Sequence, residues 1–445
     1  MTYRLRRPRD LQDGEESRLR SVSPRPLQCY TPTPPSSFRR ARIRTYRLMD
    51  IPRVPTPAHM KKAPLPMNFK AYWTRLPYQA GRPEVREGAC MTACCGALYL
   101  YGGLSKTVLS DLYVLRADFT AWEPVHISGL EPEARYGHSM SESHSQLVVF
   151  GGALSANPKT QIRECFNTVR LLEPTEKSQA TWSQLPARGH IVEMRRYHSG
   201  SVVGRHLLVV GGMNQKNKVL DDCAVLDLKT GLWRLAAFAD GPLAIACHSA
   251  AVVLGSEREV EGLEDLLEQS ESPQHSQPGI YLFGGVDGRG NCSNRLRFVR
   301  VSGLGDLLCT EPLTTGNPPS PRCLHSLVYH PSFSLLVVFG GKETSELSPE
   351  IFRDLHILEL RTMRWSQVLC TGGNAPRARW AHSAAALHNS IVIFGGIEAS
   401  QFSGSETFIL TLGSDALPAL ETEVRSRSLG RIRVRNGTYL MPKVY

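Results

Sequence analysis

A double glycine that recurs six times constrains this chain more than any other feature of its sequence. Each copy follows directly on a short run of aliphatic or aromatic residues. The spacings from one first glycine to the next are 49, 60, 73, 56 and 55 residues. Because such self-similarity marks a repeated structural unit, the repeat decides the fold. The first glycines of the pairs are Gly102, Gly151, Gly211, Gly284, Gly340 and Gly395.

Other residues recur with the glycines. A tryptophan follows four of the pairs, at positions 122, 182, 233 and 365. Each unit contains four short runs of β-branched, aliphatic and aromatic residues, separated by Gly, Pro, Ser and Asp. Such runs predict strands, so one unit is expected to be a four-stranded antiparallel sheet. Five pairs also have an upstream His-Ser dipeptide, which begins at His138, His198, His248, His325 and His382.

These motifs resemble the kelch repeat family. The stretch Arg135-Tyr-Gly-His-Ser-Met140 followed by Leu147-Val-Val-Phe-Gly-Gly152 is typical, and Arg379-Trp-Ala-His-Ser-Ala384 begins a similar unit. The resemblance covers roughly residues 67 to 415. It implies an all-β fold, a six-bladed kelch-type β-propeller in which four-stranded blades surround a central channel.

The ring must close, and the tryptophans predict how. The last unit has no Trp after Gly396, but Trp73 lies 18 residues before Met91, which we place at the histidine position of the first unit. We therefore expect residues 72 to 76 to form the outer strand of the last blade, paired with residues 407 to 412. Such closure removes exposed sheet edges.

The charge of the chain is concentrated outside the propeller. Residues 1 to 66 contain 15 Lys and Arg against 5 Asp and Glu, and residues 421 to 445 contain 6 against 2. The whole chain carries +11, so the remaining body is about −3. We interpret 1–66 as a disordered, basic tail rich in Pro, Ser and Arg, and 416–445 as a short basic extension. Such a tail can bind an acidic surface such as a microtubule, nucleic acid or a membrane, with weak sequence preference. The alternative is a solvated tail with no dedicated partner.

The sequence also bears on compartment. It contains no apolar run of about 18 residues for a membrane span, and no apolar signal segment near residue 1. Its 11 cysteines show no C-x-x-C spacing and suggest free thiols in a reducing compartment. We expect a cytoplasmic protein, with a cytoskeletal or nuclear location as alternatives.

The candidate binding site lies in the turns that lead into the blades. Four of these turns carry an arginine three residues before the histidine, and we expect several guanidinium groups to point at one central mouth, suited to carboxylate or phosphate. Neighbouring aromatic residues would add contact area. The alternative is that each arginine pairs with a neighbouring blade. The candidate residues are Arg135, Tyr136, Arg195, Arg196, Tyr197, Arg322, Arg379 and Trp380.

Blade 4 departs from the pattern. It has Ile245 in place of the arginine and no tryptophan near Cys309. It also contains an acidic stretch from Glu257 to Glu271, in which Leu263, Leu266 and Leu267 have helical spacing. We expect this stretch on the face opposite the arginine turns.

Catalysis is not expected, because the histidines are accounted for by the repeat and no nucleophile with a base or phosphate-binding loop is evident. We expect no cofactor and no metal. The favoured function is a protein-protein interaction scaffold that holds an acidic or carboxylate-bearing partner while its tails bind a cytoskeletal or other acidic assembly. One alternative is a substrate receptor of a cullin ubiquitin ligase, although an N-terminal region of 66 disordered residues cannot hold a BTB domain. A kelch-type enzyme is the second alternative.

Overall fold

The computed structural model describes twelve stretches of the chain. It divides the chain into two units, residues 1–63 and 64–445, and every described residue belongs to the second. The expected tails and the acidic stretch 257–271 lie outside the described residues. The described residues are 70–77, 81–130, 132–160, 162–175, 178–238, 241–254, 278–301, 307–344, 349–371, 374–399, 401–402 and 404–413.

Six of the seven sheets in the described part of the chain have four or more strands, and we number these six as blades 1 to 6. Blade 1 contains β2 (Cys90–Cys94), β3 (Ala97–Tyr101), β4 (Leu112–Arg116) and β5 (Trp122–Pro124). Blade 2 contains β7 (Tyr136–Ser143), β8 (Gln146–Ala156), β10 (Val169–Thr175) and β11 (Gln179–Gln184), with β9 (Arg163–Cys165) beside β8. Blade 3 contains β13 (Ser199–Val203), β14 (His206–Val210), β15 (Cys223–Asp227) and β16 (Leu232–Ala236).

The second half of the ring repeats this order. Blade 4 contains β17 (Ser249–Val253), β18 (Gly279–Phe283), β19 (Leu296–Val301) and β20 (Leu307–Thr310). Blade 5 contains β22 (Ser326–His330), β23 (Leu335–Phe339), β24 (Leu355–Glu359) and β25 (Arg364–Gln367), with a 3-10 turn at Pro331–Phe333. Blade 6 contains β27 (Ser383–Leu387), β28 (Ser390–Phe394), β31 (Thr407–Gly413) and β1 (Lys70–Arg75), beside a small hairpin of β29 (Ile397–Glu398) and β30 (Gln401–Phe402).

Four blades carry a fifth, parallel strand at the outer edge. These short strands come from the segment that connects one blade to the next, and the sequence pattern did not predict them. They are β6 (His126–Gly129) on β11, β12 (Arg188–Gly189) on β16, β21 (Thr315–Gly316) on β25 and β26 (Cys370–Thr371) on β1.

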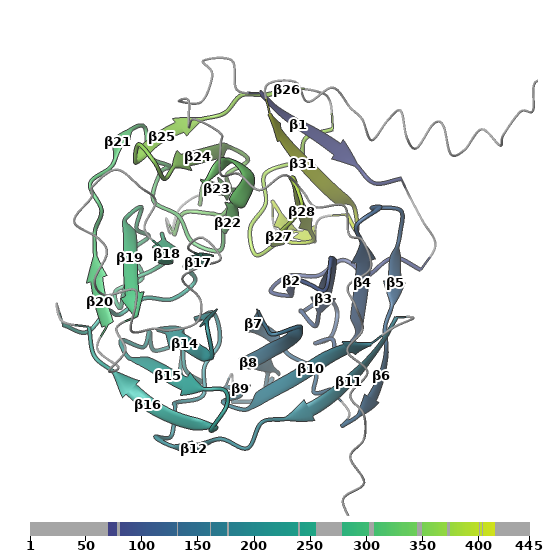
Figure 1. Ribbon diagram of the computed structural model, residues 1–445, viewed down its shortest axis with the longest axis vertical. Helices are drawn as coiled ribbons and strands as arrows, with labels where there is room; N and C mark the ends of the chain where they lie inside the picture. Colours follow the sequence, from purple (N-terminus) through teal and green to yellow (C-terminus); the bar gives the residue numbers. More distant parts are fainter. Residues whose placement is uncertain are drawn as a thin grey trace, which may run out of the picture. The chain divides into compact units, whose positions relative to one another are not determined.

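The six innermost strands surround a common axis (Figure 1). Each contacts the innermost strands of both neighbouring blades, in the closed order β2, β7, β13, β17, β22, β27 and back to β2. Three of the second strands, β3, β23 and β28, are buried along their whole length, because each blade is packed between two others. The predicted six-bladed, all-β propeller is confirmed. No helix among the described residues is long and apolar enough to span a bilayer.

The N-terminal strand completes the last blade. β1 pairs antiparallel with β31, and Trp73 lies opposite Leu410. This is the pairing that the tryptophan spacing predicts. A further contact joins the ends of the ring, because the indole Nε1 of Trp122 in blade 1 donates to Thr407 Oγ1 in blade 6 at 2.8 Å.

One assignment within the first unit is wrong. Cys90 pairs with Tyr101, just as Ser139 pairs with Phe150, so the residue at the histidine position is Ala89 and not Met91. The spacing from the preceding tryptophan, Trp73, is then 16 residues rather than 18.

Five blades use a tryptophan to pack on the preceding blade. Each indole lies against the aromatic residue that precedes the glycine pair of its neighbour, with ring centroids 4.9 to 5.8 Å apart. Such pairs contribute both buried area and favourable ring geometry. The pairs are Trp122 with Phe394, Trp182 with Tyr101, Trp233 with Phe150, Trp365 with Phe283 and Trp73 with Phe339.

Candidate partner-binding face

A closed ring of backbone hydrogen bonds surrounds the propeller axis. The residue immediately before the histidine position in each blade donates its N–H to the carbonyl of its counterpart in the preceding blade, at 2.7 to 2.9 Å. All six have left-handed φ values between 53° and 64°. The ring holds the six blades at a fixed distance from the axis. Its members are Gly88, Gly137, Tyr197, Cys247, Leu324 and Ala381.

The central channel at this ring is narrow and uncharged. Its cavity has a volume of about 120 Å³ and is lined by the ring residues and the residues after them, which include the five repeated histidines. Burial raises the pKa of the Cys247 thiol to about 12. Burial also lowers the pKa of His248 and of His382 to about 3. The channel lining is therefore neutral near pH 7.

Three of the five repeated histidines, His198, His248 and His382, join neighbouring blades through a side-chain contact with a serine. The Nε2 atom of His198 lies 2.9 Å from Ser139 Oγ of the preceding blade, and His248 and Ser199 repeat this contact at 2.8 Å. The His198 ring also stands edge-on to Phe150, with centroids 5.2 Å apart. These side chains are committed to packing. Within the described part of the chain, no three His, Cys, Asp or Glu side chains come together as metal ligands.

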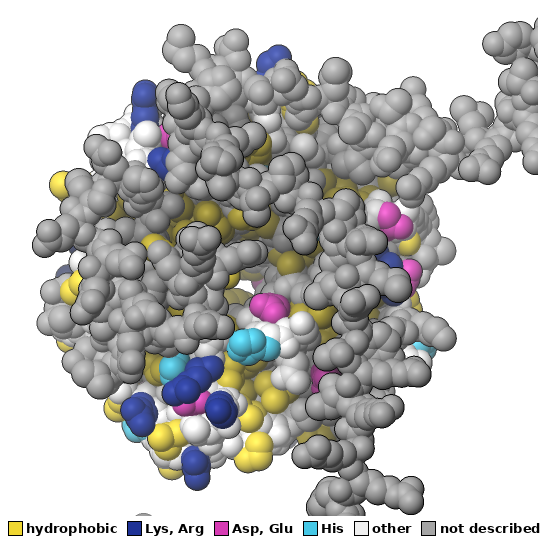
Figure 2. Space-filling model, viewed as in Figure 1, with side chains coloured by type: hydrophobic (Ala, Val, Ile, Leu, Met, Phe, Trp, Pro, Cys, Tyr) yellow, Lys and Arg dark blue, Asp and Glu magenta, His cyan; other side chains and the backbone are white. Residues whose placement is uncertain are grey.

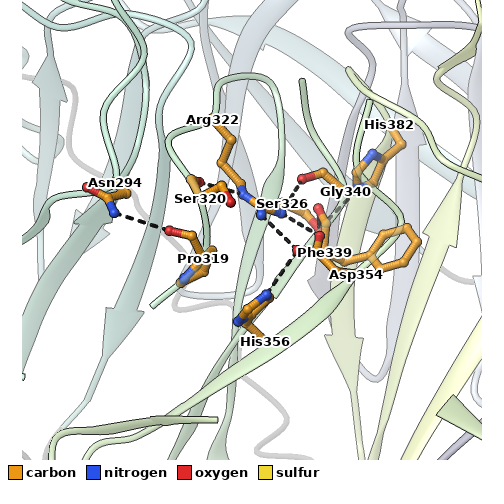
Figure 3. Close-up of polar contacts among 10 residues, drawn as sticks. All are labelled: Asn294, Pro319, Ser320, Arg322, Ser326, Phe339, Gly340, Asp354, His356 and His382. Carbon is orange, nitrogen blue, oxygen red and sulfur yellow. Dashed lines mark hydrogen bonds and ion pairs between the residues drawn. The ribbon is translucent and has the colours of Figure 1, made fainter. Parts of the chain in front are cut away.

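The four predicted arginines do not point at the mouth, and that expectation is wrong. Arg322 is fully buried, and its Nη1 donates to the Gly340 carbonyl at 3.0 Å (Figure 3). Its Nη1 and Nη2 also hold both carboxylate oxygens of Asp354, at 2.7 and 2.9 Å. Burial alone would raise the pKa of Asp354, but hydrogen bonds from Arg322 and His356 outweigh it and hold that pKa well below its usual range. The guanidinium is therefore neutralised inside its own blade.

The other three arginines have the same environment. Each is fully buried and donates to the carbonyl of the first glycine of its own blade at 2.8 to 2.9 Å. They satisfy a buried carbonyl at the strand turn and bind a carboxylate, which leaves no donor aimed at the channel. The pairs are Arg135 with Glu133, Arg195 with Asp222 and Arg379 with Glu398.

A fifth arginine of this class was missed. Arg86 is fully buried, donates to the Gly102 carbonyl at 3.0 Å and binds Asp111. It lies three residues before Ala89, so correct placement of the histidine position in the first unit would have found it.

Of the other predicted residues, Tyr197 belongs to the hydrogen-bond ring, and Tyr136, Arg196 and Trp380 are each next to a ring residue in the chain. Tyr197 belongs to the ring and is partly exposed, and Tyr136 is buried edge-on beneath it, with centroids 5.9 Å apart. Arg196 lies next to Tyr197, and its Nη2 donates to Asn217 Oδ1 at 2.7 Å. Arg196 is 5% exposed, so the loop at Asn217 largely covers it.

Trp380 and Tyr197 are the two predicted residues that are partly exposed. The Lys342 ammonium lies 3.8 Å from the ring centroid of Trp380. This distance is typical of a cation–π contact. Lys342 was not predicted, because no other blade has a lysine at that position. Burial raises the pKa of Glu87, the residue that corresponds to Trp380 in blade 1, and Lys342 opposes that shift.

Several described Lys and Arg side chains gather at the lower left of Figure 2, over the place that β15 and β16 occupy in Figure 1. The five arginines of the entry turns are buried, and the residues that line the channel include Tyr197, Leu324 and Ala381. Such a surface suits side-chain contacts better than binding of a free anion.

Three relatives share part of the chain. Mouse "Rab9 effector protein with kelch motifs" is 29% identical over 240 residues, 52% of this chain and 56% of the relative. Human "Kelch domain-containing protein 1" is 30% identical over 46% of this chain and 51% of its own length. "Acyl-CoA-binding domain-containing protein 4" of Arabidopsis thaliana is 25% identical over 52% of this chain. The chain spans 30 to 56% of the length of these relatives.

A solved structure and a family model agree with the fold. The structure of YjhT has a TM-score of 0.54 and 15% identity, and the match covers 76% of this chain and 99% of that one, so it supports the fold alone. The model described as "KLHDC2/KLHL20/DRC7 Kelch-repeats domain" matches residues 67–258 and 274–431. With more than half of its residues matched, the chain belongs to this kelch-repeat family.

Proposed function

We propose that this protein is a non-catalytic interaction scaffold that holds a protein partner at the mouth of its propeller. The observation that carries the proposal is the partly exposed pair of Tyr197 and Trp380 beside a narrow, neutral channel. Trp, Tyr and Arg are the residues most enriched among interface hot spots. Kelch-repeat relatives suggest an interaction role, and the mouse relative is named as an effector of another protein.

The proposed partner is acidic, although not for the reason expected from the sequence. The five buried arginines are satisfied within the propeller, so they do not supply the attraction. Lys342, which stacks on Trp380, supplies it instead, with Glu87 as the opposing charge. A partner carboxylate beside Lys342 would be attracted by the ammonium group. Exclusion of water from the contact would strengthen that attraction.

The basic tails supply the second half of the proposal. Their net charges of about +10 in residues 1–66 and +4 in residues 421–445 support binding to an acidic assembly, of which a cytoskeletal polymer is our choice. Such binding weakens with salt, because it depends on counterion release and screened attraction. We place the protein in the cytoplasm, since none of the ten described cysteines forms a disulfide.

The mouth is tested with the full chain carrying Trp380→Ala. We expect quantitative mass spectrometry of affinity-purified complexes to show loss of the proteins held by the wild type, because the aromatic anchor is removed and Lys342 loses the ring on which it stacks. The matched control is Leu254→Ala, because Leu254 is an exposed residue directly after β17 and its replacement is expected to change nothing. Equal recovery by Trp380→Ala and wild type would contradict the proposal, and cullin subunits retained by the wild type would favour the ligase alternative.

The tails are tested separately in the same full chain. Replacing Arg39, Arg40, Arg42, Arg44 and Arg47 by Gln removes five charges from one cluster. We expect sedimentation with polymerised microtubules to fall at low salt and to be weak for both chains at high salt. Equal sedimentation of the two chains at low salt would overturn anchoring by this tail.

A further inference from the structure

The interface between blades 3 and 4 lacks the aromatic pair found at the other five. Cys309 pairs with Val299 in the sheet, as Trp182 pairs with Leu172 in blade 2, so Cys309 occupies the tryptophan position. On the facing side, Val210 precedes the glycine pair where the other blades have Phe or Tyr. Both large rings are thus missing from a single interface.

A cavity of about 340 Å³ lies at this interface. Phe238, Gly241, Pro242 and Leu243 line it from the segment that connects the two blades. The sheet of blade 4 contributes the rest of the lining, and this volume is at the lower end of the range for ligand-binding sites. The lining residues of the sheet are Arg295, Arg297, Cys309 and Glu311.

The cavity contains an arginine whose counterpart in blade 2 is fully satisfied. Arg297 pairs with Leu282, two residues before the first glycine, and Arg170 occupies the same position opposite Val149. In blade 2, Glu133 of the connecting segment binds Arg170 with both carboxylate oxygens, and Gln184 Oε1 accepts from Nη1 at 2.6 Å.

Blade 4 does not supply the same carboxylate. The residue that corresponds to Glu133 is Leu243, two residues before Ile245 in the connecting segment. Arg297 has an ion pair with Glu311, Nε to Oε1 at 3.5 Å, and the exposed Arg295 shares that oxygen at 3.2 Å. The side chain of Arg297 is only 13% exposed, and burial lowers its pKa. Two guanidinium groups thus face one carboxylate in this cavity.

We propose that this cavity binds a segment of a partner protein that presents an acidic side chain next to an aromatic one. The carboxylate would take the place that Glu133 has in blade 2, and the aromatic ring would take the place of the missing indole. Blade 2 itself is the template for both groups, because it fills the same positions with Glu133 and Trp182. The site is separate from the mouth and goes beyond the function proposed above.

The test measures binding of a fluorescein-labelled peptide with blocked ends, Gly-Ser-Trp-Glu-Gly-Ser, to the full chain by fluorescence polarisation. We expect saturable binding, and binding about tenfold weaker or worse when Gln replaces Glu in the peptide or in an Arg297→Gln variant, because a charge-assisted pair is lost. The matched control is Arg234→Gln on the exposed side of β16, which we expect to bind normally.

A second variant fills the cavity. Cys309→Trp restores the residue that five other blades have at this position, so we expect it to fold with an unchanged or higher Tm and to lose peptide binding. If this variant fails to fold, the proposal is tested by the Arg297→Gln variant and the Gln peptide alone. Trp380→Ala should leave the peptide affinity unchanged, which separates this site from the mouth.

Three results would overturn the proposal. One is no saturable binding of the Trp-Glu peptide at millimolar concentration. Another is equal affinity for the Glu and Gln peptides. The third concerns Asp240, which belongs to the connecting segment but lies outside the described residues. Binding that appears only in an Asp240→Asn variant would mean that the chain neutralises Arg297 with its own carboxylate.

Discussion

The buried arginines act as structural ions within single blades. Arg322 satisfies a glycine carbonyl and a carboxylate at the same time, and it has no exposed surface. Sequence spacing predicted that these arginines recur, but not where they point. Their carboxylate partners, such as Asp222 and Asp354, lie 27 and 32 residues further along the chain, and only the folded sheet brings them close.

The first prediction follows from this geometry. Arg322→Met leaves Asp354 and the Gly340 carbonyl without their donor, so we expect the free energy of unfolding to fall by about 3 to 5 kcal/mol. Chemical denaturation followed by tryptophan fluorescence measures it. Arg364→Met, at an exposed position on β25, should change stability by less than about 0.5 kcal/mol. A loss of similar size in both variants would contradict a specific role for the buried pair.

At the scale of the element, the turn after each second strand depends on its glycines. Gly151 has φ of 67°, and a Cβ added there would lie 2.5 Å from His198 Cε1 of the next blade and 2.8 Å from the Arg195 carbonyl. The glycine is required both by its left-handed backbone and by the close approach of the neighbouring blade. This is why the double glycine was such a reliable guide to the ends of these strands.

Two glycine substitutions separate these effects. Gly290 has φ of 86° but no atom within 4 Å of the added Cβ, so Gly290→Ala should cost only the left-handed backbone term of about 1 to 2 kcal/mol. We expect Gly151→Ala to cost clearly more, because His198 must move as well. Thermal unfolding of both variants gives the comparison. Equal Tm values would show that the neighbouring blade moves to accommodate the added Cβ without loss of stability.

Over the whole molecule, the blade count and the closing strand were predictable because both follow from spacing along the chain. The residues of the mouth were less predictable. Trp380 and Tyr197 were found from their place beside the repeated motif, whereas Lys342 and the cavity at Arg297 arise where single blades depart from the repeat. A repeat pattern identifies the residues that the blades share. It does not predict side chains that occur in one blade alone.

The repeated histidines make the stability of the whole ring depend on pH. The pKa of His248 and of His382 falls from 6.5 to about 3 on folding because of burial, so the unfolded chain binds protons that the folded chain does not. Stability is therefore complete above pH 6.5 and is lost as the pH falls toward 3. We expect a loss of about 1 to 2 kcal/mol for each such histidine between pH 7 and pH 5.

Urea unfolding at the two pH values tests this. The loss on acidification should be smaller in His382→Gln than in the wild type, because one depressed group is removed. His126→Gln is the control, since that side chain is exposed on β6. An identical pH dependence in wild type and His382→Gln would contradict the assignment of this stability loss to the buried histidines.

The pairing of β1 with β31 has a consequence for synthesis. A ribosome that has made Arg75 must add more than 330 further residues before Thr407, the first residue of the partner strand, exists. At roughly 5 to 20 residues per second, this delay is on the order of 15 to 70 seconds. Throughout that interval the nascent chain carries an unpartnered strand with Trp73 in it. Chaperones that shield apolar segments during translation would therefore bind the N-terminal strand β1. They would release it only after β31 has been synthesised and can pair with it.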